Sequence, residues 1–245
     1  MKNIYIETYA NFLKKHLKLK KQLKVVFDAS NGSGALLFKS LTKENKLLSV
    51  TYLNDMPDGN FPGHGPNPLA DGACDQLIAE IRKQKADLGI AFDNDADRAF
   101  FVDETGRLLT STESAIFMGE NLSGPVVVDF VIGPLAYDYF KKLKRKVITA
   151  KVGLYFIKQA IAKHKAEFAA EYSGHYYFKA INGSDCAVMA AICFMNRLSE
   201  IRNQESGIRN LSDWLKKLPR YHQKMVNFVY ARENFSQLVE KFSLQ

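Results

Sequence analysis

Residues 88–98 read Leu88-Gly89-Ile90-Ala91-Phe92-Asp93-Asn94-Asp95-Ala96-Asp97-Arg98, an apolar run that ends in three alternating aspartates. The apolar part predicts a buried strand, and residues 99–102 are predicted to pair with it across the acidic loop. Carboxylates this close repel one another unless a cation lies among them. Oxygen ligands suit Mg²⁺, Mn²⁺ or Ca²⁺ better than zinc. Asp93, Asp95 and Asp97 are therefore predicted metal ligands.

The acidic loop is not an EF-hand. An EF-hand needs glycine at position 6 and glutamate at position 12 of the loop, where this chain has Arg98 and Glu104. A solvated acidic turn is the alternative interpretation. The place of the loop, at the end of a buried strand, favours a functional site in an α/β protein.

Strands and helices alternate on both sides of this stretch, which predicts an α/β fold with largely parallel sheets covered by helices. Asp71 is expected to cap a helix that carries Leu77, Ile78 and Ile81. Residues 172–185 are expected to form a loop. Further strands are expected at 24–28, 48–53, 125–129, 147–150 and 168–171, and further helices at 35–41, 112–120, 133–143, 153–164 and 186–198.

This order of elements predicts two consecutive three-layer α/β/α domains, a metal-binding one over residues 1–105 and a second one over residues 106–205. Residues 206–245 are different. They are expected to form a linker, a short helix at 211–218, a strand at 225–230 and a helix at 235–242. One strand and one helix bury little surface, so this part is expected to be the start of a further α+β domain.

The composition is that of a soluble globular protein, because 47% of the 245 residues are hydrophobic and only 24% are charged. No run of 18 apolar residues is present, which excludes a transmembrane helix, and polar residues near the start exclude a signal peptide. The three cysteines are too few for a disulfide framework or a zinc site. A cytoplasmic location is the expectation.

The net charge of +8 suggests nucleic-acid binding, but the distribution of charge argues against it. Residues 1–24 carry +6 and residues 141–146 carry +5, so the rest of the chain is net negative. Neither cluster alternates with the aromatic residues on which bases stack. Both are predicted to be solvated helix surfaces, and a positive field also suits an anionic small substrate.

A second polar loop, Glu171-Tyr172-Ser173-Gly174-His175, follows the strand predicted at 168–171. Glu171, Ser173 and His175 can face one way if the backbone stays extended. Such groups suit sugar hydroxyls and phosphate. A Ser–His nucleophile pair is a second interpretation, although no nucleophile-elbow pattern surrounds Ser173. A surface loop without function is the third.

Taken together, these stretches resemble the α-D-phosphohexomutases, which include phosphomannomutase and phosphoglucomutase. The most specific stretch is residues 86–98. The other matching stretches, in the order of that family, are residues 25–34, 57–62 and 66–69, Gly153 with Phe156-Ile157-Lys158, and residues 171–178. The resemblance extends over nearly the whole chain.

The resemblance implies a four-domain isomerase that interconverts hexose 1- and 6-phosphates through a phosphoserine and a hexose bisphosphate. The serine lies in the first domain, Mg²⁺ in the second, the sugar site in the third and a phosphate site in the fourth. By motif, Asp93, Asp95 and Asp97 would bind Mg²⁺, and Arg98 would lie beside the transferred phosphate. Substrate would be bound by Glu171, Ser173, His175 and Lys158, the first two through the sugar O3 and O4 hydroxyls.

The chain also departs from the pattern of the family. No stretch resembles the Thr-Ala-Ser-His-Asn-Pro loop that supplies the phosphoserine, nor the Arg-x-Ser-Gly-Thr-Glu phosphate loop. Asn94 replaces a glycine, and it is expected to adopt the left-handed conformation that asparagine tolerates. Leu154 replaces a histidine, and the lysine usual near residues 130–133 is missing.

The sequence therefore predicts the second and third domains of a phosphohexomutase with the start of the fourth, inactive alone because the serine is absent. Two alternatives remain. One is a split enzyme completed by a separate chain that carries the phosphoserine domain, with residues 12–19 and 225–242 as the interface. The other is a module that binds sugar phosphate or Mg²⁺ without catalysis.

Overall fold

The stretch at residues 88–103 forms the antiparallel pair predicted for it, with Phe92 opposite Ala99 at the turn. The computed structural model describes residues 4–201 and 207–219. The first sheet has the order β2-β1-β3-β4, in which β1 pairs in parallel with both β2 and β3. Its strands are β1 (Leu23–Asp28), β2 (Leu48–Leu53), β3 (Leu88–Phe92) and β4 (Ala99–Asp103).

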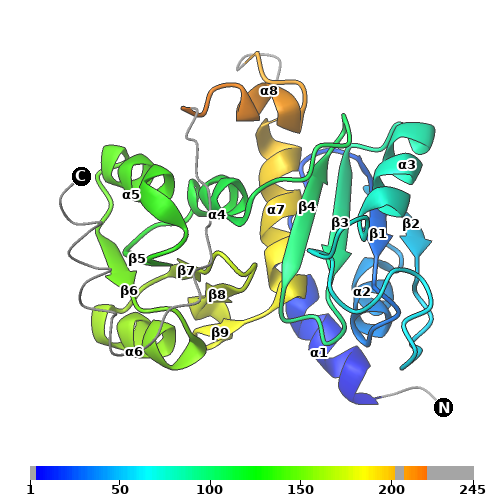
Figure 1. Cartoon of the computed structure of the whole chain (residues 1–245), viewed down its shortest axis with the longest axis horizontal. Helices are drawn as coiled ribbons and strands as arrows, with labels where there is room; N and C mark the ends of the chain where they lie inside the picture. Colours follow the sequence, from blue (N-terminus) through cyan, green and yellow to red (C-terminus); the bar gives the residue numbers. More distant parts are fainter. Residues whose placement is uncertain (1–3, 202–206, 220–245) are drawn as a thin grey trace, which may run out of the picture.

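The second sheet has the order β6-β5-β7-β8-β9 (Figure 1). β5 pairs in parallel with β6 and β7, and the last two pairings are antiparallel. Its strands are β5 (Val126–Asp129), β6 (Val147–Ala150), β7 (Phe168–Ala170), β8 (Tyr176–Phe178) and β9 (Ser184–Asp185).

Most helices lie close to the ranges predicted for them, but the helix predicted in the basic stretch at residues 1–24 ends at Lys14, and residues 15–22 are not helical. The helices are α1 (Ile4–Lys14), α2 (Gly34–Thr42), α3 (Asp75–Gln84), α4 (Ser111–Gly119), α5 (Gly133–Lys142), α6 (Leu154–His164), α7 (Ala187–Ile201) and α8 (Leu211–Leu215), with a 3₁₀ turn at Lys179–Ile181. In the part of the chain that the structure describes, no helix has the length and apolar character that a membrane crossing requires. The strand and helix expected at 225–230 and 235–242 lie outside the described residues.

Two further elements differ from their predicted form. α3 begins at Asp75 rather than after Asp71, because residues 70–74 form tight turns in which Gly72 has φ +76°. The expected loop at 172–185 contains β8 and β9. Tyr176 and Tyr177 of β8 are almost fully buried, and a buried run of three aromatic residues is too short for its periodicity to be recognised as a strand.

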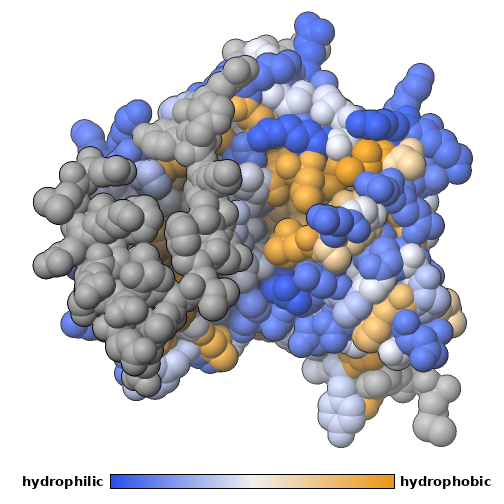
Figure 2. All heavy atoms as spheres, in the orientation of Figure 1, coloured by the Kyte–Doolittle hydropathy of each residue, from blue (hydrophilic) through white to orange (hydrophobic). Residues whose placement is uncertain are grey.

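Each sheet is the middle of three layers, because alternate side chains of its central strand point to opposite faces. In β1, Val25 and Phe27 pack towards α1, α2 and α7, whereas Val26 packs against α3. In the second sheet Val127 of β5 packs against α6, and its two neighbours face the opposite layer. Hydrophobic side chains also gather at the centre of the surface in Figure 2, over β3 and β4.

α7 joins the two sheets into one core. It runs between them in Figure 1, and Phe194 on this helix stacks on Phe101 of β4 with ring centroids 3.9 Å apart. The same ring lies 4.4 Å from Phe117 of α4. α7 also binds the segment after α1, because the Asn196 side chain accepts from Lys18 N and donates to His16 O. A helix assigned from sequence to the second domain thus covers the first sheet as well.

The carboxyl end of β1 is held by a buried polar cluster. Asp28 accepts hydrogen bonds from Ser30 N (2.9 Å) and Asn54 Nδ2 (3.1 and 3.0 Å). His64 Nε2 lies 3.2 Å from the same carboxylate, and the hydrogen bond to Asp28 raises the pKa of His64. This cluster fixes the loops that follow β1 and β2.

Replacing Phe194 by alanine is expected to lower the free energy of unfolding by about 3–5 kcal/mol, because it removes a fully buried ring at the junction of both sheets. Urea unfolding followed by circular dichroism measures this change. Phe130→Ala is the matched control, since Phe130 is 67% exposed and its loss should change stability by about 0.5 kcal/mol or less. Equal effects of the two substitutions would contradict the shared core.

His64 is expected to make stability depend on pH. Its pKa is raised in the folded protein, so its contribution is complete below the unfolded value of about 6.5 and is lost as the pH rises through the folded value. Between about pH 6 and about pH 8, the parent chain should therefore lose more stability than His64→Gln. His164→Gln is the control, and it should keep the slope of the parent chain. An unchanged slope in His64→Gln would contradict this role.

Candidate functional site

The three aspartates predicted to bind metal converge. Asp93, Asp95 and Asp97 each offer a carboxylate oxygen, and these oxygens lie within 4.8 Å of one another. Asp93 is buried at the end of β3, whereas Asp95 is exposed. A turn in which Ala96 N donates to Asp93 O (3.3 Å) brings them to one side.

The residue of this loop with a left-handed backbone conformation is Ala96, with φ +62°, and not Asn94 as expected. Asn94 has another role, because its carbonyl accepts a hydrogen bond from Ser33 N (2.9 Å). A Cβ on Gly32 would lie 2.3 Å from the same carbonyl oxygen. Glycine at position 32 therefore allows the loop after β1 to approach the acidic loop, and the two loops support each other.

Arg98 is held beside the acidic loop. Its Nε donates to Asp93 Oδ2 at 2.6 Å, and its backbone N donates to Asp93 Oδ1 at 3.2 Å. Nη1 lies 3.5 Å from Asn67 Oδ1, so the loop that contains residues 66–69 also reaches this site. The guanidinium group is fixed in orientation and remains partly exposed.

The acidic loop fits a hard divalent cation. Asp97 Oδ1 is buried and has no hydrogen-bond partner; the nearest cationic atom, Arg98 Nε, is 3.7 Å away. Such an oxygen is costly to bury unless a ligand satisfies it. The contacts of Asp93 with Arg98 leave lone pairs free, since a carboxylate accepts up to about four hydrogen bonds.

The second predicted loop lies against the first. Ala99 N donates to Gly174 O (3.1 Å), and Arg98 and His175 form an antiparallel β-bridge. A Cβ on Gly174, which has φ +96°, would lie 2.8 Å from the Phe100 ring, so glycine is needed for this close approach. Residues from the two sheets thereby meet at one site.

His175 connects the two loops through its side chain. Nε2 lies 3.3 Å from Asp97 Oδ2, and Nδ1 lies 2.8 Å from Ser173 Oγ. Ser173, His175 and Asp97 thus form a continuous polar chain from the loop at residues 171–175 to the acidic loop.

Glu171 is buried, and both of its carboxylate oxygens accept hydrogen bonds. Its Oε1 accepts from Gly153 N (2.9 Å), and its Oε2 accepts from the Tyr177 hydroxyl (2.6 Å). Burial and this hydrogen bond raise the pKa of Tyr177, which therefore stays protonated and donates. Lys158 lies on the exposed side of α6, and within the described residues no hydrogen bond or ion pair joins it to the other predicted residues.

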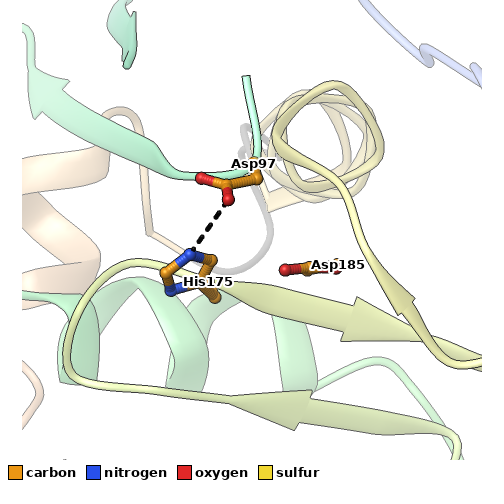
Figure 3. A group of neighbouring side chains, drawn as sticks. All are labelled: Asp97, His175 and Asp185. Carbon is orange, nitrogen blue, oxygen red and sulfur yellow. Dashed lines mark ion pairs between the residues drawn. The ribbon is translucent and has the colours of Figure 1, made fainter. Parts of the chain in front are cut away.

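Several residues of the site were not predicted. Asp129 at the end of β5 accepts hydrogen bonds from Val131 N, Ile132 N and Tyr172 N, and burial raises its pKa. Tyr177 orients Glu171, and Asp185 lies next to His175 (Figure 3). The sequence did contain a signal for two of the buried carboxylates that support the site. Asp28 and Asp129 each end an apolar strand, and Asp93 directly follows one.

The surface around Gly153 is apolar. Val152, Leu154, Tyr155 and Phe156 are 41–66% exposed. Phe130 is also exposed and directly follows Asp129, which pairs with Ala150 in the neighbouring strand. Leu154, where the resemblance implied a histidine, is thus exposed and apolar, and so is Phe130 in the segment where the lysine was implied.

The structure also has a hollow of about 650 Å³ that is lined by other residues than those predicted from the sequence. Its lining includes Asp103, Arg107, Glu113, Tyr172 and Ser212. None of the eight residues predicted from sequence to bind metal or substrate lines it. The predicted residues other than Lys158 instead lie in the two loops that follow β3 and β7.

Two family models match the chain in succession. Phosphoglucomutase/phosphomannomutase α/β/α domain II matches residues 3–106, and domain III matches residues 107–221. A phosphomannomutase of Methanocaldococcus jannaschii is 31% identical over 200 residues, which are 80% of this chain and 44% of that protein. A phosphoglucomutase of Neisseria meningitidis is 34% identical over 180 residues, 70% of this chain and 38% of that protein. The chain spans less than half the length of these relatives.

Solved structures agree with these matches. A phosphoglucomutase/phosphomannomutase family protein of Burkholderia thailandensis superposes with a TM-score of 0.76 at 26% identity, over 88% of this chain and 46% of that one. The fold is shared with an Aspergillus fumigatus N-acetylphosphoglucosamine mutase in complex with GlcNAc-6P and magnesium, with a TM-score of 0.62 at 19% identity, over 88% of this chain and 53% of that one. The chain belongs to the phosphoglucomutase/phosphomannomutase family, whose α/β/α domains II and III it contains.

Proposed function

We propose that this chain binds Mg²⁺ through Asp93, Asp95 and Asp97 and binds a hexose phosphate beside it at residues 171–175. It would thus form the metal- and sugar-binding part of an isomerase that interconverts hexose 1- and 6-phosphates. The observation that carries the proposal is the contact between the acidic loop and the loop at residues 171–175. A backbone hydrogen bond from Ala99 N to Gly174 O and the contact of His175 with Asp97 join the two loops.

We expect Arg98 to act in phosphoryl transfer. Its guanidinium group is oriented by Asp93 and remains partly exposed, so it can donate to the oxygens of a phosphoryl group placed next to the acidic loop. A fixed guanidinium fork stabilises the negative charge that spreads over these oxygens in the transition state. A bound Mg²⁺ supplies further charge compensation to the transferred phosphoryl group.

The loop at residues 171–175 supplies groups for the sugar. Ser173 can donate to or accept from a hydroxyl, and its contact with His175 orients the imidazole. Glu171 is fixed by Gly153 and Tyr177, so a sugar hydroxyl would donate to a lone pair that these contacts leave free. Lys158, on the exposed side of α6, would reach an anionic substrate as it docks.

Solved structures of a protein with this fold contain magnesium and hexose phosphates, which supports both proposed ligands. The Aspergillus mutase that shares this fold was crystallised with GlcNAc-6P and magnesium, and a further structure of this fungal mutase contains glucose 1,6-bisphosphate. The 245 residues contain no stretch that resembles the phosphoserine loop of the family. We therefore expect this chain alone to bind Mg²⁺ and hexose phosphate without turnover.

Asp95→Asn is expected to weaken Mg²⁺ binding by about tenfold or more, because it removes one of three charged oxygen ligands. Isothermal titration calorimetry of the purified chain with Mg²⁺ measures the change. Asp71→Asn removes the same charge from an exposed loop position and should leave the affinity unchanged. Equal affinities of Asp95→Asn and the parent chain would exclude a magnesium site in the acidic loop.

A coupled mutase assay with Mg²⁺ and glucose 1,6-bisphosphate tests the reaction. The chain alone should give no turnover, and a Mg²⁺-dependent rise in melting temperature should report binding of the bisphosphate. Turnover that is lost in Asp95→Asn would mean that another phosphoryl carrier is present, and would overturn the expected inactivity.

Adding a separately produced serine domain from a relative distinguishes the remaining alternatives. Turnover gained on mixing would favour a split enzyme, whereas binding of the bisphosphate without any gain would favour a binding module. Absence of any binding of the bisphosphate would contradict the proposed sugar site.

A further inference from the structure

The hollow of about 650 Å³ borders the loop at residues 171–175 through one residue, Tyr172. The backbone N of Tyr172 donates to the buried carboxylate of Asp129 at 3.0 Å, which fixes this residue at the edge of the hollow. Pockets that bind small molecules measure about 300–1,000 Å³. The hollow therefore has the size of a ligand site.

One wall of the hollow is α8, which contacts both α/β/α units. Trp214 of this helix lies 4.7 Å from Phe117 of α4, between ring centroids, and donates from Nε1 to Glu120 Oε2 at 3.3 Å. Ser212 N donates to Glu104 Oε2 at 3.3 Å, and Glu104 directly follows β4. The wall is thus formed before a ligand arrives, so little conformational entropy is lost when one binds.

The charged side chains that line the hollow have partners within the protein. Arg107 forms an ion pair with Glu113, and Lys216 forms one with Asp213 at 3.1 Å. Asp103 is 1% exposed, and its Oδ1 accepts from Arg107 N at 2.9 Å. The lining contains two cationic side chains and two carboxylates, so their charges cancel. The hollow therefore favours neither an anion nor a cation.

Hydroxyl groups give the hollow its hydrogen-bonding character. Thr105 Oγ1 donates to Asp103 Oδ1 at 2.6 Å, and Ser212 Oγ donates to Glu104, so both oxygens keep lone pairs that can accept from a ligand. The Tyr172 hydroxyl has no hydrogen bond within residues 4–201 and 207–219, and it can donate as well as accept.

We propose that the hollow is a pocket for an uncharged sugar. The hydroxyl groups of a sugar would donate to the free lone pairs of the hollow and accept from Tyr172. Leu135 and Leu215 also line the hollow, and they supply apolar surface for the C–H groups of the ring. The pocket itself does not depend on the proposed function. Only its place beside a bound hexose phosphate does, since Tyr172 is the residue common to the hollow and the loop at residues 171–175.

Saturation-transfer NMR of the purified chain with glucose as the probe tests the pocket. Saturating glucose 6-phosphate occupies the site proposed at residues 171–175, so the glucose signal that remains reports on the hollow. Leu135→Trp places a larger side chain in the hollow and should abolish this signal. Leu122→Trp is the matched control and should keep it, because Leu122 is also a partly buried leucine of the same core but does not line the hollow. The two variants should melt within a few degrees of each other, which separates loss of binding from loss of folding.

A second pair of variants tests the hydroxyl group of Tyr172. Tyr172→Phe should weaken glucose binding by about threefold or more, because it removes one hydrogen bond to the sugar. Tyr155→Phe removes the hydroxyl of an exposed tyrosine outside the hollow and should leave the affinity unchanged.

Three results would overturn the pocket: no glucose signal in the parent chain, complete displacement of glucose by glucose 6-phosphate, or equal effects of Leu135→Trp and Leu122→Trp. Failure of the proposed function gives a different result. Glucose 6-phosphate would then not bind, whereas a glucose signal that is lost in Leu135→Trp alone would still support the pocket.

Discussion

The structure depends on the burial of α7 between two sheets. Phe194 on this helix packs against Phe101 of the first sheet's β4 and Phe117 of α4, so one hydrophobic core extends through both α/β/α units. The dense packing of such a core resists changes in the angle between its parts. The carboxyl ends of β3 and β7 are thereby fixed next to each other, and the polar loops after them form one site.

The site combines a rigid support with an open surface. Gly32 and Gly174 permit close approaches that a side chain would block, and buried hydrogen bonds of Asp28 and Asp129 fix the loops that follow the central strands. Rigid elements hold functional groups more precisely than loops that lack such support. Arg98, Ser173 and His175 are partly exposed at the end of this support, whereas Glu171 is buried within it.

Much of the fold follows from local patterns. β1 and β5 are largely apolar runs that end in aspartate, and Asp93 directly follows the apolar run of β3. The helices α2, α5 and α6 follow short loops, so strand and helix periodicity place these elements within a few residues. Prediction was wrong where the local signal was short or ambiguous. β8 has only three residues, and the left-handed position of the acidic loop is Ala96 rather than Asn94, because the path of this loop is set by its contacts with Ser33.

The sequence by itself determined the alternating α/β architecture, the three alternating carboxylates of the acidic loop, and the polar character of residues 171–175. These properties depend on neighbouring residues, whose spacing is visible in the chain. Only the tertiary structure decided that His175 meets Asp97 and Asp185, that Tyr177 holds Glu171, and that α7 serves both sheets. Such contacts join residues far apart in sequence, and their geometry depends on how the two sheets pack against one shared helix.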